Sequence, residues 1–357
     1  MIAPHFPSNA GRRRWSRLVT LAALMIVGTA WGAAPQERTG VSLTGPLTHA
    51  NLAVYVVRGA ATDRRDYITL DEGLTARTVA VREKPSGADV NTLEIENRSD
   101  KWLFLQAGDI VKGGKQDRTI MTDLTLAPRS GPQPLEAFCV EHGRWTPSGD
   151  GMAFSKNTGI VAGGSLKRAI QSDKPGSQER VWQEVAKTEE RAAVAVRKSG
   201  VASAPVSFSA TGTYNAIAEH ETLGRSRDAY VSALLPQIRK DPQAIGLVVA
   251  INGVVTSADV YASPALFQRV SPKLLSSYAF EALLARDAAP AAATPPLTQV
   301  MAFLSRPAAA AASTQTVGRS MQRATRETGD AVMYEYSRVA DSKTPIRVVV
   351  HQNYVKK

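Results

Sequence analysis

Glycines and cationic side chains are concentrated in one stretch of the 357-residue chain, Gln106–Arg118, which reads QAGDIVKGGKQDR. Glycine lets backbone amides approach a ligand closely, and the lysines and arginine favour an anion beside them. The stretch is not a P-loop in either register. Counted from Gly108, Gly114 stands where the phosphate-binding lysine belongs; counted back from Gly114-Lys115, Asp109 replaces the first glycine and Gln116 the hydroxyl residue that holds magnesium. Two interpretations stay open: an anion-binding loop that uses Lys115, Gln116 and Arg118, or a tight glycine turn whose charges are solvated.

A second stretch, Phe138–Trp145, carries a carboxylate, an imidazole, a guanidinium and an indole within five positions. These groups can supply an acid or base, an anion clamp and a stacking face. Glu141 is therefore the candidate general base, and Arg144 and Trp145 are candidate ligand-binding residues. Glu141 can equally be a structural partner of Arg144. Cys139 lies between two apolar residues, a setting in which free cysteine behaves as a small buried hydrophobe.

Metal and cofactor chemistry have no positive signal in the sequence. Cys139 is the only cysteine, which excludes an intramolecular disulfide and multi-cysteine zinc sites. No HExxH or other spaced ligand set is present, and His220 between two glutamates is typical of a solvated helix position. We expect neither a metal nor a cofactor.

The N-terminus has the three parts of a secretory signal peptide. Four arginines and no acidic residue lie within the first 17 positions, an apolar run covers Leu18–Ala33, and small residues end it. Because about 20 apolar residues are needed to cross a bilayer, we favour cleavage between Ala30 and Gln36 over an uncleaved anchor. The sequence thus predicts a periplasmic or secreted protein, with no membrane attachment after cleavage. The residues after the arginine pair favour the general secretory route over the twin-arginine route.

Charge and composition exclude other common classes. Removal of residues 1–33 takes away four arginines and no acidic residue, so the net charge falls from +11 to +7. The remaining excess is spread along the chain without a basic block, so nucleic acid is not an expected partner. A chain of this length, with 43% hydrophobic residues, can bury an adequate core without disulfides.

Residues from Leu52 to about Trp145 are rich in β-strand signals. Apolar runs or period-two alternation predict strands over Ala53–Val57, Arg77–Glu83, Leu93–Ile95, Trp102–Leu105, Thr119–Leu126 and Leu135–Val140. A short Pro/Gly turn joins the last two strands, so we expect them to pair antiparallel. Residues 143–176 are polar and glycine-rich, which predicts a loop.

Helices and one hairpin dominate the second half. Apolar residues three and four apart predict helices over Ser177–Ser199 and Ala216–Lys240, with Pro236 kinking or ending the second. Asn252-Gly253 between apolar runs predicts a β-hairpin. Ser263-Pro264 and Ser271-Pro272 each place a capping serine before a proline, so we expect two consecutive helices.

Together these elements predict an α+β fold with a β-rich N-terminal half, helices and a hairpin in the second half, and a terminal β-hairpin. We divide the chain into a signal peptide (1–33), an α+β domain (40–286), an Ala/Pro-rich linker (287–318) and a C-terminal hairpin (319–357) that packs on the main domain. Within the linker we allow one short helix, around Leu297–Leu304. The sequence carries no signal for the oligomeric state.

Several segments in order along the chain resemble one known domain family. They are Gly113–Arg118 (GGKQDR), Cys139–Trp145 (CVEHGRW), Gly246–Gly253 (GLVVAING), Ala258–Tyr261 (ADVY), Leu266-Phe267 and Pro272–Tyr278 (PKLLSSY). The sequence is similar to the ADP-ribosylglycohydrolase and rhodanese-phosphatase-associated protein domain family across roughly residues 50–285. The resemblance implies a domain linked by gene association to ADP-ribose and NAD-derived metabolites, without an established reaction. The chain departs from the usual family pattern at Gly114, at Asp117, which adds charge beside the cations, and at Asp109, where the family often has glutamate.

Two hypotheses of function follow. In the first, an exported protein holds a phosphorylated or nucleotide-like ligand in a polar cleft formed by Lys115, Gln116, Arg118, Glu141, Arg144, Trp145, Asn252 and Asp259. In the second, the chain is a non-catalytic envelope scaffold or protein-interaction module, and the same charges are structural. If the protein is an enzyme, Glu141 would be the base, with Lys115 and Arg118 stabilising charge.

Both hypotheses share one geometric expectation. Antiparallel pairing of the last two strands of the β-rich half would bring the residues just before the first strand beside those just after the second. Lys115 and Arg118 should therefore lie in one neighbourhood with Glu141 and Arg144. A ligand site requires these side chains to converge on an open pocket, whereas a scaffold requires them to saturate one another.

Overall fold

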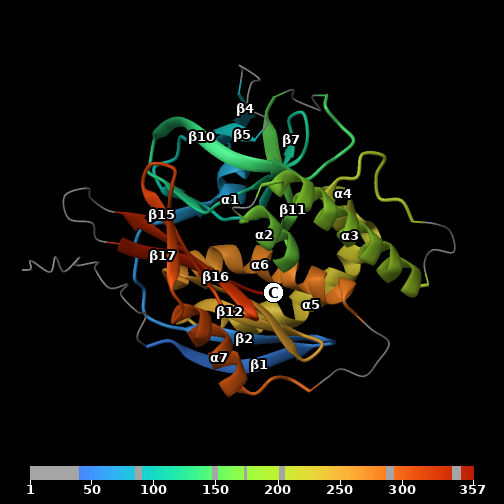
Figure 1. The fold of residues 1–357 in the computed structure, drawn as a ribbon, viewed down its shortest axis with the longest axis vertical. Helices are drawn as coiled ribbons and strands as arrows, with labels where there is room; N and C mark the ends of the chain where they lie inside the picture. Colours follow the sequence, from blue (N-terminus) through green and yellow to red (C-terminus); the bar gives the residue numbers. More distant parts are fainter. Residues whose placement is uncertain are drawn as a thin grey trace, which may run out of the picture. The chain divides into compact units, whose positions relative to one another are not determined.

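An eight-stranded antiparallel sheet is the largest element of the fold (Figure 1). Its strand order is β1-β2-β12-β13-β17-β16-β15-β14. The strands are β1 (Ser42–His49), β2 (Leu52–Arg58), β12 (Ala244–Ile251), β13 (Val254–Tyr261), β14 (Ala312–Val317), β15 (Met321–Glu327), β16 (Ala331–Val339) and β17 (Arg347–Lys356). The sheet therefore combines segments from both ends and the middle of the chain.

The computed structural model describes residues 40–84, 91–146, 152–172, 175–200, 206–286, 293–339 and 347–357. They belong to one unit, Gly40–Lys357. The expected signal peptide (1–33) and its cleavage region lie outside the described residues. Within the described ranges, no helix is both long and apolar enough to cross a membrane.

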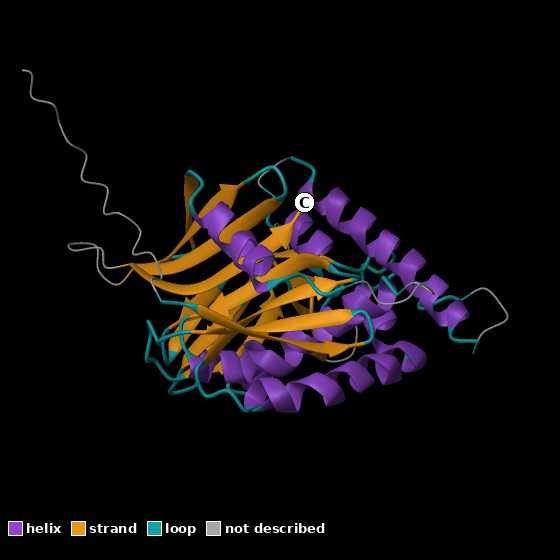
Figure 2. Cartoon of the chain, turned by 90° about the horizontal axis from the view of Figure 1, so that it is seen from below, coloured by secondary structure: helices purple, strands orange, loops and turns teal. Residues whose placement is uncertain are grey.

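Both faces of the large sheet are covered by helices, as Figure 2 shows. Successive residues of a strand point to opposite faces, and β2 is buried along almost its whole length. Leu52, Val54 and Val56 belong to the core shared with α5 (Glu221–Arg239) and α6 (Pro264–Leu284). The alternate residues of β2 pack in a second core with α7 (Leu297–Ala308). Burial on two faces explains why β2 reads as a continuous apolar run.

Two smaller sheets form the rest of the fold, at the top of Figure 1. One has the order β11-β7-β8-β10-β5-β4 and the other β3-β6-β9. Their strands are β3 (Tyr67–Thr69), β4 (Val79–Glu83), β5 (Thr92–Asn97), β6 (Trp102–Leu105), β7 (Asp109–Gly113), β8 (Arg118–Ile120), β9 (Leu124–Leu126), β10 (Ser130–Cys139) and β11 (Phe154–Val161). Helices α1 (Leu70–Thr75), α2 (Gly164–Ile170), α3 (Ser177–Lys198) and α4 (Tyr214–Glu219) flank them. Helix α6 contacts both β11 and β12, so it joins the smaller sheets to the large one.

The α+β class and the β-rich N-terminal half are confirmed. Strand β6 begins and ends where the sequence predicts. In α3 the predicted apolar stripe is the buried face: Val181, Val185, Thr188, Ala192 and Val196 are its buried residues. The hairpin turn is also confirmed, because Asn252 and Gly253 both have positive φ, as a tight type I′ turn requires.

Three local predictions are wrong. The expected strand Thr119–Leu126 is two strands, β8 and β9, which belong to different sheets. The chain leaves the six-stranded sheet, which contains β8, at Asp123. The Asp123 carboxylate accepts a hydrogen bond from the backbone N–H of Ala107 (2.7 Å). The expected loop over 143–176 contains β11 and α2. The expected helix over 216–240 is divided at His220 into α4 and α5, and α5 continues past Pro236 to Arg239.

The two helices expected around Ser271-Pro272 are one helix, α6. Ser263 is its N-cap, and the Ser263 hydroxyl accepts a hydrogen bond from the N–H of Leu266 (3.2 Å). Pro272 lacks the N–H that would bond the carbonyl of Gln268. The Ser271 hydroxyl donates to that carbonyl instead (3.2 Å), so the helix continues through the proline.

The linker expected over 287–318 is wrong in its described part. Residues 287–292 lie outside the described residues. The short helix allowed around Leu297–Leu304 is confirmed as α7, which continues to Ala308, but β14 then occupies Ala312–Val317 where a linker was expected. The terminal strands β16 and β17 do pair, yet they do not form a separate hairpin (319–357) laid on the domain. Strand β17 pairs with β13 on one side and β16 on the other, so it is an interior strand.

Candidate functional site

The two loops with candidate chemistry do meet. Strands β8 and β10 pair antiparallel, with Arg118 opposite Cys139. The backbone N–H of Asp117 donates to Glu141 Oε2 (3.0 Å), and Arg144 Nη1 donates to the carbonyl of Gly114 (2.8 Å). The expected neighbourhood of Lys115, Arg118, Glu141 and Arg144 is therefore confirmed, and we call it the loop cluster.

Glu141 is saturated within the loop cluster. Arg144 binds it through two hydrogen bonds, Nε to Oε1 (2.9 Å) and Nη2 to Oε2 (2.6 Å), and the Thr211 hydroxyl donates to Oε1 (2.7 Å). Burial would raise the pKa of Glu141, but the hydrogen bonds from Arg144 and Thr211 outweigh burial and lower it. A carboxylate with a low pKa and engaged oxygens is a poor proton acceptor. The geometry therefore favours the structural interpretation of Glu141 over the general base.

Arg118 is the most deeply buried cation of the loop cluster, with no exposed surface. Its guanidinium donates to Gln116 Oε1 (3.3 Å), to Glu83 Oε1 (3.3 Å) and to the Cys139 sulfur. Burial raises the pKa of the Cys139 thiol, which keeps it protonated. Arg118 and Gln116 thus face protein groups, and Cys139 is a buried thiol, as expected.

Trp145 is the exposed member of the loop cluster. Its side chain is half exposed, and Lys115 Nζ lies 5.3 Å from the ring centre while the Arg118 guanidinium lies 5.8 Å from it. Both distances are within the range of a cation–π interaction. Neither Trp145 nor Lys115 lines either of the two cavities described below.

The glycines and Asp117 also serve packing. A Cβ on Gly114 would lie 2.3 Å from the ring of Phe154, so a larger residue would displace β11. Asp117 accepts hydrogen bonds from the N–H of Gly113 (3.0 Å), the Thr213 hydroxyl (2.7 Å) and the Asn215 amide (2.7 Å). The charge of Asp117 is therefore used inside the protein. The loop cluster holds loops together.

Asn252 and Asp259 do not belong to the loop cluster, which corrects the expected site. Asn252 lies in the β12–β13 turn, where its side chain donates to the carbonyl of Ala285 (2.8 Å) and accepts from Asn51 (2.9 Å). Asp259, on β13, is fully buried. Its Oδ1 accepts from Lys167 (3.3 Å) and Asn353 (2.9 Å).

A histidine joins Asp259 to a second carboxylate. His351 Nε2 lies 2.9 Å from Asp259 Oδ1, and Nδ1 lies 2.6 Å from Asp123 Oδ2. Burial would lower the pKa of His351, but Asp123 and Asp259 outweigh burial and raise it. Burial would raise the pKa of Asp259, yet Lys167 and His351 hold that pKa well below its ordinary value. This buried network links β13, β17 and α2 to the loop that carries Asp123.

A cavity of about 340 Å³ lies between α1, the start of β7, α5 and α6. Its charged lining residues are Asp71, Glu72, Asp109, Arg227, Asp228, Arg269 and Lys273. Apolar side chains of Leu70, Phe104, Val231, Val270 and Pro272 complete much of the wall. An apolar cavity with a few convergent polar groups is the usual form of a small-molecule site. We call it the α5–α6 cavity.

The inner wall of this cavity contains a buried ion group. Lys273 Nζ lies 2.9 Å from Asp71 Oδ1 and 2.9 Å from Asp109 Oδ1, and Asp109 Oδ2 accepts from the N–H of Gln106 (2.9 Å). Burial raises the pKa of Asp109 against the effect of Lys273, and the Asp71 carboxylate acts in the same direction as burial. Burial would lower the pKa of Lys273, but the two carboxylates raise it, so its side chain is an ammonium.

Two arginines also line the cavity, and their carboxylate partners are exposed. The Arg227 side chain is largely buried and makes only long contacts, to Asp228 Oδ1 and to the carbonyl of Ala218 (3.3 Å). Arg269 is one third exposed and pairs with Glu72 (2.9 Å) and Asp66 (3.5 Å). Ion pairs of this exposure contribute at most about 1 kcal/mol, so the guanidinium groups can exchange these partners for a ligand.

The back of the α5–α6 cavity contacts the His351 network. The Tyr261 hydroxyl donates to Gln106 Oε1 (2.7 Å). The ring of Phe104 packs edge-on against Tyr261 and His351, with centres 6.0 and 6.1 Å apart. One short segment, 104–109, thus has the cavity on one side and the buried network on the other.

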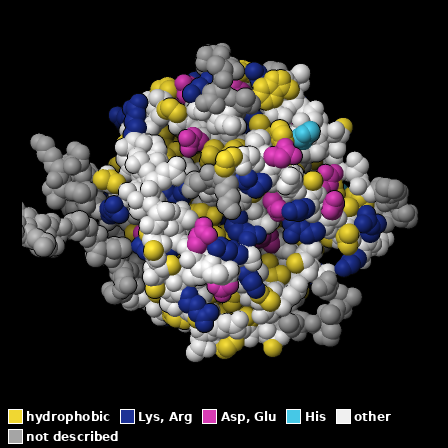
Figure 3. Space-filling model, viewed as in Figure 1, with side chains coloured by type: hydrophobic (Ala, Val, Ile, Leu, Met, Phe, Trp, Pro, Cys, Tyr) yellow, Lys and Arg dark blue, Asp and Glu magenta, His cyan; other side chains and the backbone are white. Residues whose placement is uncertain are grey.

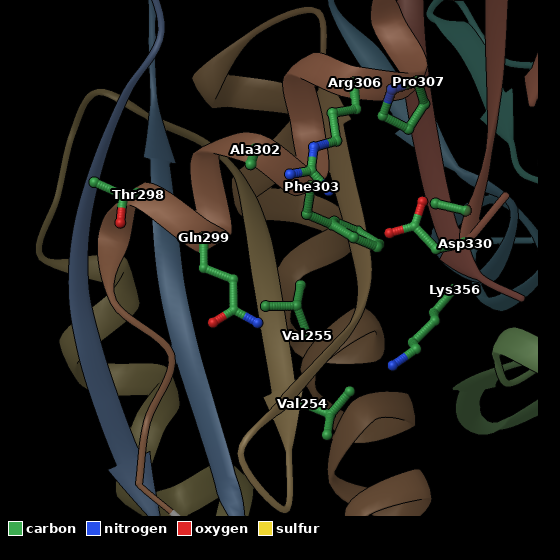
Figure 4. Close-up of a pocket in the computed structure, with 11 residues that line it drawn as sticks. Val254, Val255, Thr298, Gln299, Ala302, Phe303, Arg306, Pro307, Asp330 and Lys356 are labelled. Carbon is green, nitrogen blue, oxygen red and sulfur yellow. The ribbon is translucent and has the colours of Figure 1, made fainter. Parts of the chain in front are cut away.

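A second cavity, of about 390 Å³, lies beside α7 on the opposite face of the large sheet (Figure 4). Arg306, Asp330 and Lys356 surround an apolar floor that includes Val255 and Phe303. All three charged residues are exposed to solvent, whereas the α5–α6 cavity has charged groups that are buried. We therefore assign the α5–α6 cavity, although it is smaller, as the candidate site.

Surface charge alone does not mark either cavity. On the face drawn in Figure 3, basic and acidic side chains are intermingled. Within the described residues, no three histidine, cysteine, aspartate or glutamate side chains are grouped so as to hold a metal ion.

Sequence reasoning missed most of this site. Asp109 lies in a segment that was selected for its glycines and cations, and Lys273 lies in one selected for family resemblance. Neither residue was predicted as a site residue. Asp71, Arg227 and Arg269 come from elements with no functional signal in the sequence.

Comparison with known proteins gives one family. Residues 40–353 match the family model described as the ARG and Rhodanese-Phosphatase-superfamily-associated Protein domain. No curated protein and no solved structure gives a significant match.

Proposed function

The chain belongs to the ARG and Rhodanese-Phosphatase-superfamily-associated Protein domain family, and we propose that it binds a phosphorylated or nucleotide-like small molecule in the α5–α6 cavity. One observation carries the proposal: two largely buried cations, Lys273 and Arg227, line one cavity together with an apolar wall. The family description names an association and no reaction, so the proposal is limited to binding.

The lining suits the parts of such a ligand. Phe104, Val231 and Val270 offer apolar surface to a base or sugar face, and arginine guanidinium groups bind phosphate oxygens in a bidentate manner. The volume, about 340 Å³, is at the lower end of the usual range for small-molecule sites. It suits a mononucleotide or sugar phosphate better than a large ligand.

Thermal shift of the mature protein tests the proposal. We would screen AMP, ADP-ribose and ribose 5-phosphate, with inorganic phosphate and adenosine for comparison. A ligand present at 100 times its dissociation constant should add about 2.7 kcal/mol of stability. Arg227→Gln should abolish the shift, and Arg306→Gln, at the cavity beside α7, is the matched control.

The other outcomes are equally informative. Loss of the shift in Arg306→Gln but not in Arg227→Gln would place the ligand beside α7 and overturn the assignment. No shift with any compound would favour the alternative, a non-catalytic envelope scaffold or protein-interaction module. This alternative is supported by the loop cluster, in which Glu141, Arg144 and Arg118 form hydrogen bonds with other protein groups.

We also propose that the protein works outside the cytoplasm, in the periplasm or as a secreted protein. The support is the arginine-containing, then apolar N-terminal sequence. N-terminal sequencing of protein from the periplasmic or culture fraction should start between Ala30 and Gln36. Recovery of intact residues 1–33 in a membrane fraction would show an anchor instead.

A further inference from the structure

The cations of the α5–α6 cavity differ in how exposed their carboxylate partners are. At the inner wall, the Lys273 ammonium contacts both Asp71 and Asp109, so this wall has no excess of positive charge whether or not Asp109 holds a proton. Arg227 and Arg269, in contrast, pair with Asp228, Glu72 and Asp66, whose side chains are exposed to solvent. Exposed carboxylates are readily solvated, so phosphate oxygens can replace them at the guanidinium groups, whereas the less exposed Asp71 and Asp109 stay beside Lys273 and disfavour a dianion there.

The inner wall is complementary to hydroxyl groups. An ammonium has three donors, and two described contacts of Lys273 Nζ use two of them. The carboxylates of Asp71 and Asp109 accept further hydrogen bonds, since each ionised carboxylate has about four acceptor positions. A hydroxyl both donates and accepts, so neighbouring hydroxyls can bond carboxylate and ammonium at once without bringing charge into a buried site.

We propose that the inner wall is a hydroxyl-recognition subsite, which orients a phosphorylated ligand with a ribose-type diol toward Asp71, Asp109 and Lys273 and its phosphate toward Arg227 and Arg269. This inference rests on the proposed function and adds to it the ligand's orientation and the chemical group that confers specificity. It predicts discrimination against deoxy sugars, which Arg227 and Arg269 alone would not produce.

Isothermal titration with two matched pairs of probes tests the inference. The pairs are AMP with 2′-deoxy-AMP, and ribose 5-phosphate with 2-deoxyribose 5-phosphate. Wild type should bind the hydroxyl-bearing member at least about tenfold more tightly, because a buried polar group loses its partner in the deoxy complex. In Asp71→Asn this ratio should fall to about one, mainly through weaker binding of the hydroxyl-bearing member.

Matched variants separate the two ends of the cavity. Arg227→Gln should weaken both members of a pair equally and leave the ratio unchanged. Asp330→Asn, in the cavity beside α7, should change neither affinity. Urea denaturation shows whether each variant is folded. If Asp71→Asn does not fold, Asp109→Asn tests the hydroxyl subsite in its place.

The failures are distinguishable. Equal binding of both members of a pair by wild type overturns the subsite and leaves the proposed function in place. So does a ratio that persists in both Asp71→Asn and Asp109→Asn. If no probe of either pair binds wild type, the proposed function fails and the subsite with it.

Discussion

A carboxylate whose oxygens are all engaged behaves differently from one that lines a cavity, and Glu141 and Asp109 illustrate the two cases. Glu141 accepts from Arg144, Thr211 and the backbone of Asp117. Asp109 also has a cation and a backbone N–H, but it lines the α5–α6 cavity, and burial raises its pKa. Both residues are buried and acidic, so only their surroundings separate a scaffold residue from a candidate site residue.

The structural role of Glu141 predicts a stability effect. Glu141→Ala leaves the partly buried guanidinium of Arg144 with only the longer contact to Asp117 (3.5 Å) and removes the acceptor of Thr211 and of the Asp117 N–H, which should cost about 1–3 kcal/mol. Lys115→Ala is the control in the same cluster. Its side chain contributes a cation–π contact with the exposed Trp145, which amounts to less than about 1 kcal/mol. Urea denaturation measures both, and similar small losses in the two variants would contradict the assignment.

His351 predicts how stability depends on pH. Because its pKa is raised in the folded state, protonated His351 stabilises the fold fully below the unfolded-state pKa of about 6.5. That contribution is lost as the pH rises through the folded-state pKa. The free energy of unfolding of wild type, relative to that of His351→Gln, should therefore decrease from pH 6 upward. A difference that stays constant between pH 5.5 and 9 would show that His351 does not titrate with folding.

At the scale of elements, Ser263-Pro264 begins helix α6 and Ser271-Pro272 lies within it, so we expect the two serines to contribute unequally to stability. Ser263→Ala removes the N-cap of the helix and should cost about 1 kcal/mol. Ser271→Ala removes one hydrogen bond to the carbonyl of Gln268 within a continuous helix, and we expect a smaller loss. Chemical denaturation of the two variants under identical conditions gives the order. The reverse order would mean that α6 has a second start at Pro272.

Local patterns predicted elements where one local signal dominated. The stripe of α3 and the Asn252-Gly253 turn are specified by neighbours along the chain, so α3 and the β12–β13 hairpin were predicted correctly. Strand β14 is exposed along most of its length, and its Ala- and Ser-rich start resembles a linker. The break between β8 and β9 depends on Asp123, whose partners, Ala107 and His351, are distant in sequence. No local pattern contains that information.

At the scale of the whole molecule, the loop cluster could be predicted from the sequence and the α5–α6 cavity could not. The loop cluster was predictable because one antiparallel strand pair brings its loops together. The α5–α6 cavity takes Asp71 from α1, Asp109 from β7, Arg227 from α5 and Lys273 from α6. Only the packing of α5 against α6, and of α6 against β3 and β11, makes them neighbours.

The interior position of β17 predicts the effect of a truncation. Removal of residues 347–357 exposes the edges of β13 and β16 and opens the large sheet in its middle, so cooperative unfolding should be lost. A chain that begins at Gly40 is the control and should unfold like wild type, since Gly40–Lys357 is one unit. Circular dichroism during urea titration distinguishes the two. A sharp transition in the C-terminal truncation would show that the sheet tolerates the loss of β17.

The strand order of the large sheet has a consequence for when the protein can fold. Strand β2 pairs with β12, and Asn51 bonds Asn252, 201 positions later. Such a fold has a high contact order, so its nucleation must bring distant segments together and is intrinsically slow. During synthesis the apolar β2 segment emerges long before its partner, and the sheet closes only after β17 has followed. Under the export that we propose, this delay would keep the chain unfolded while it crosses the membrane, with its apolar segments open to a holdase chaperone.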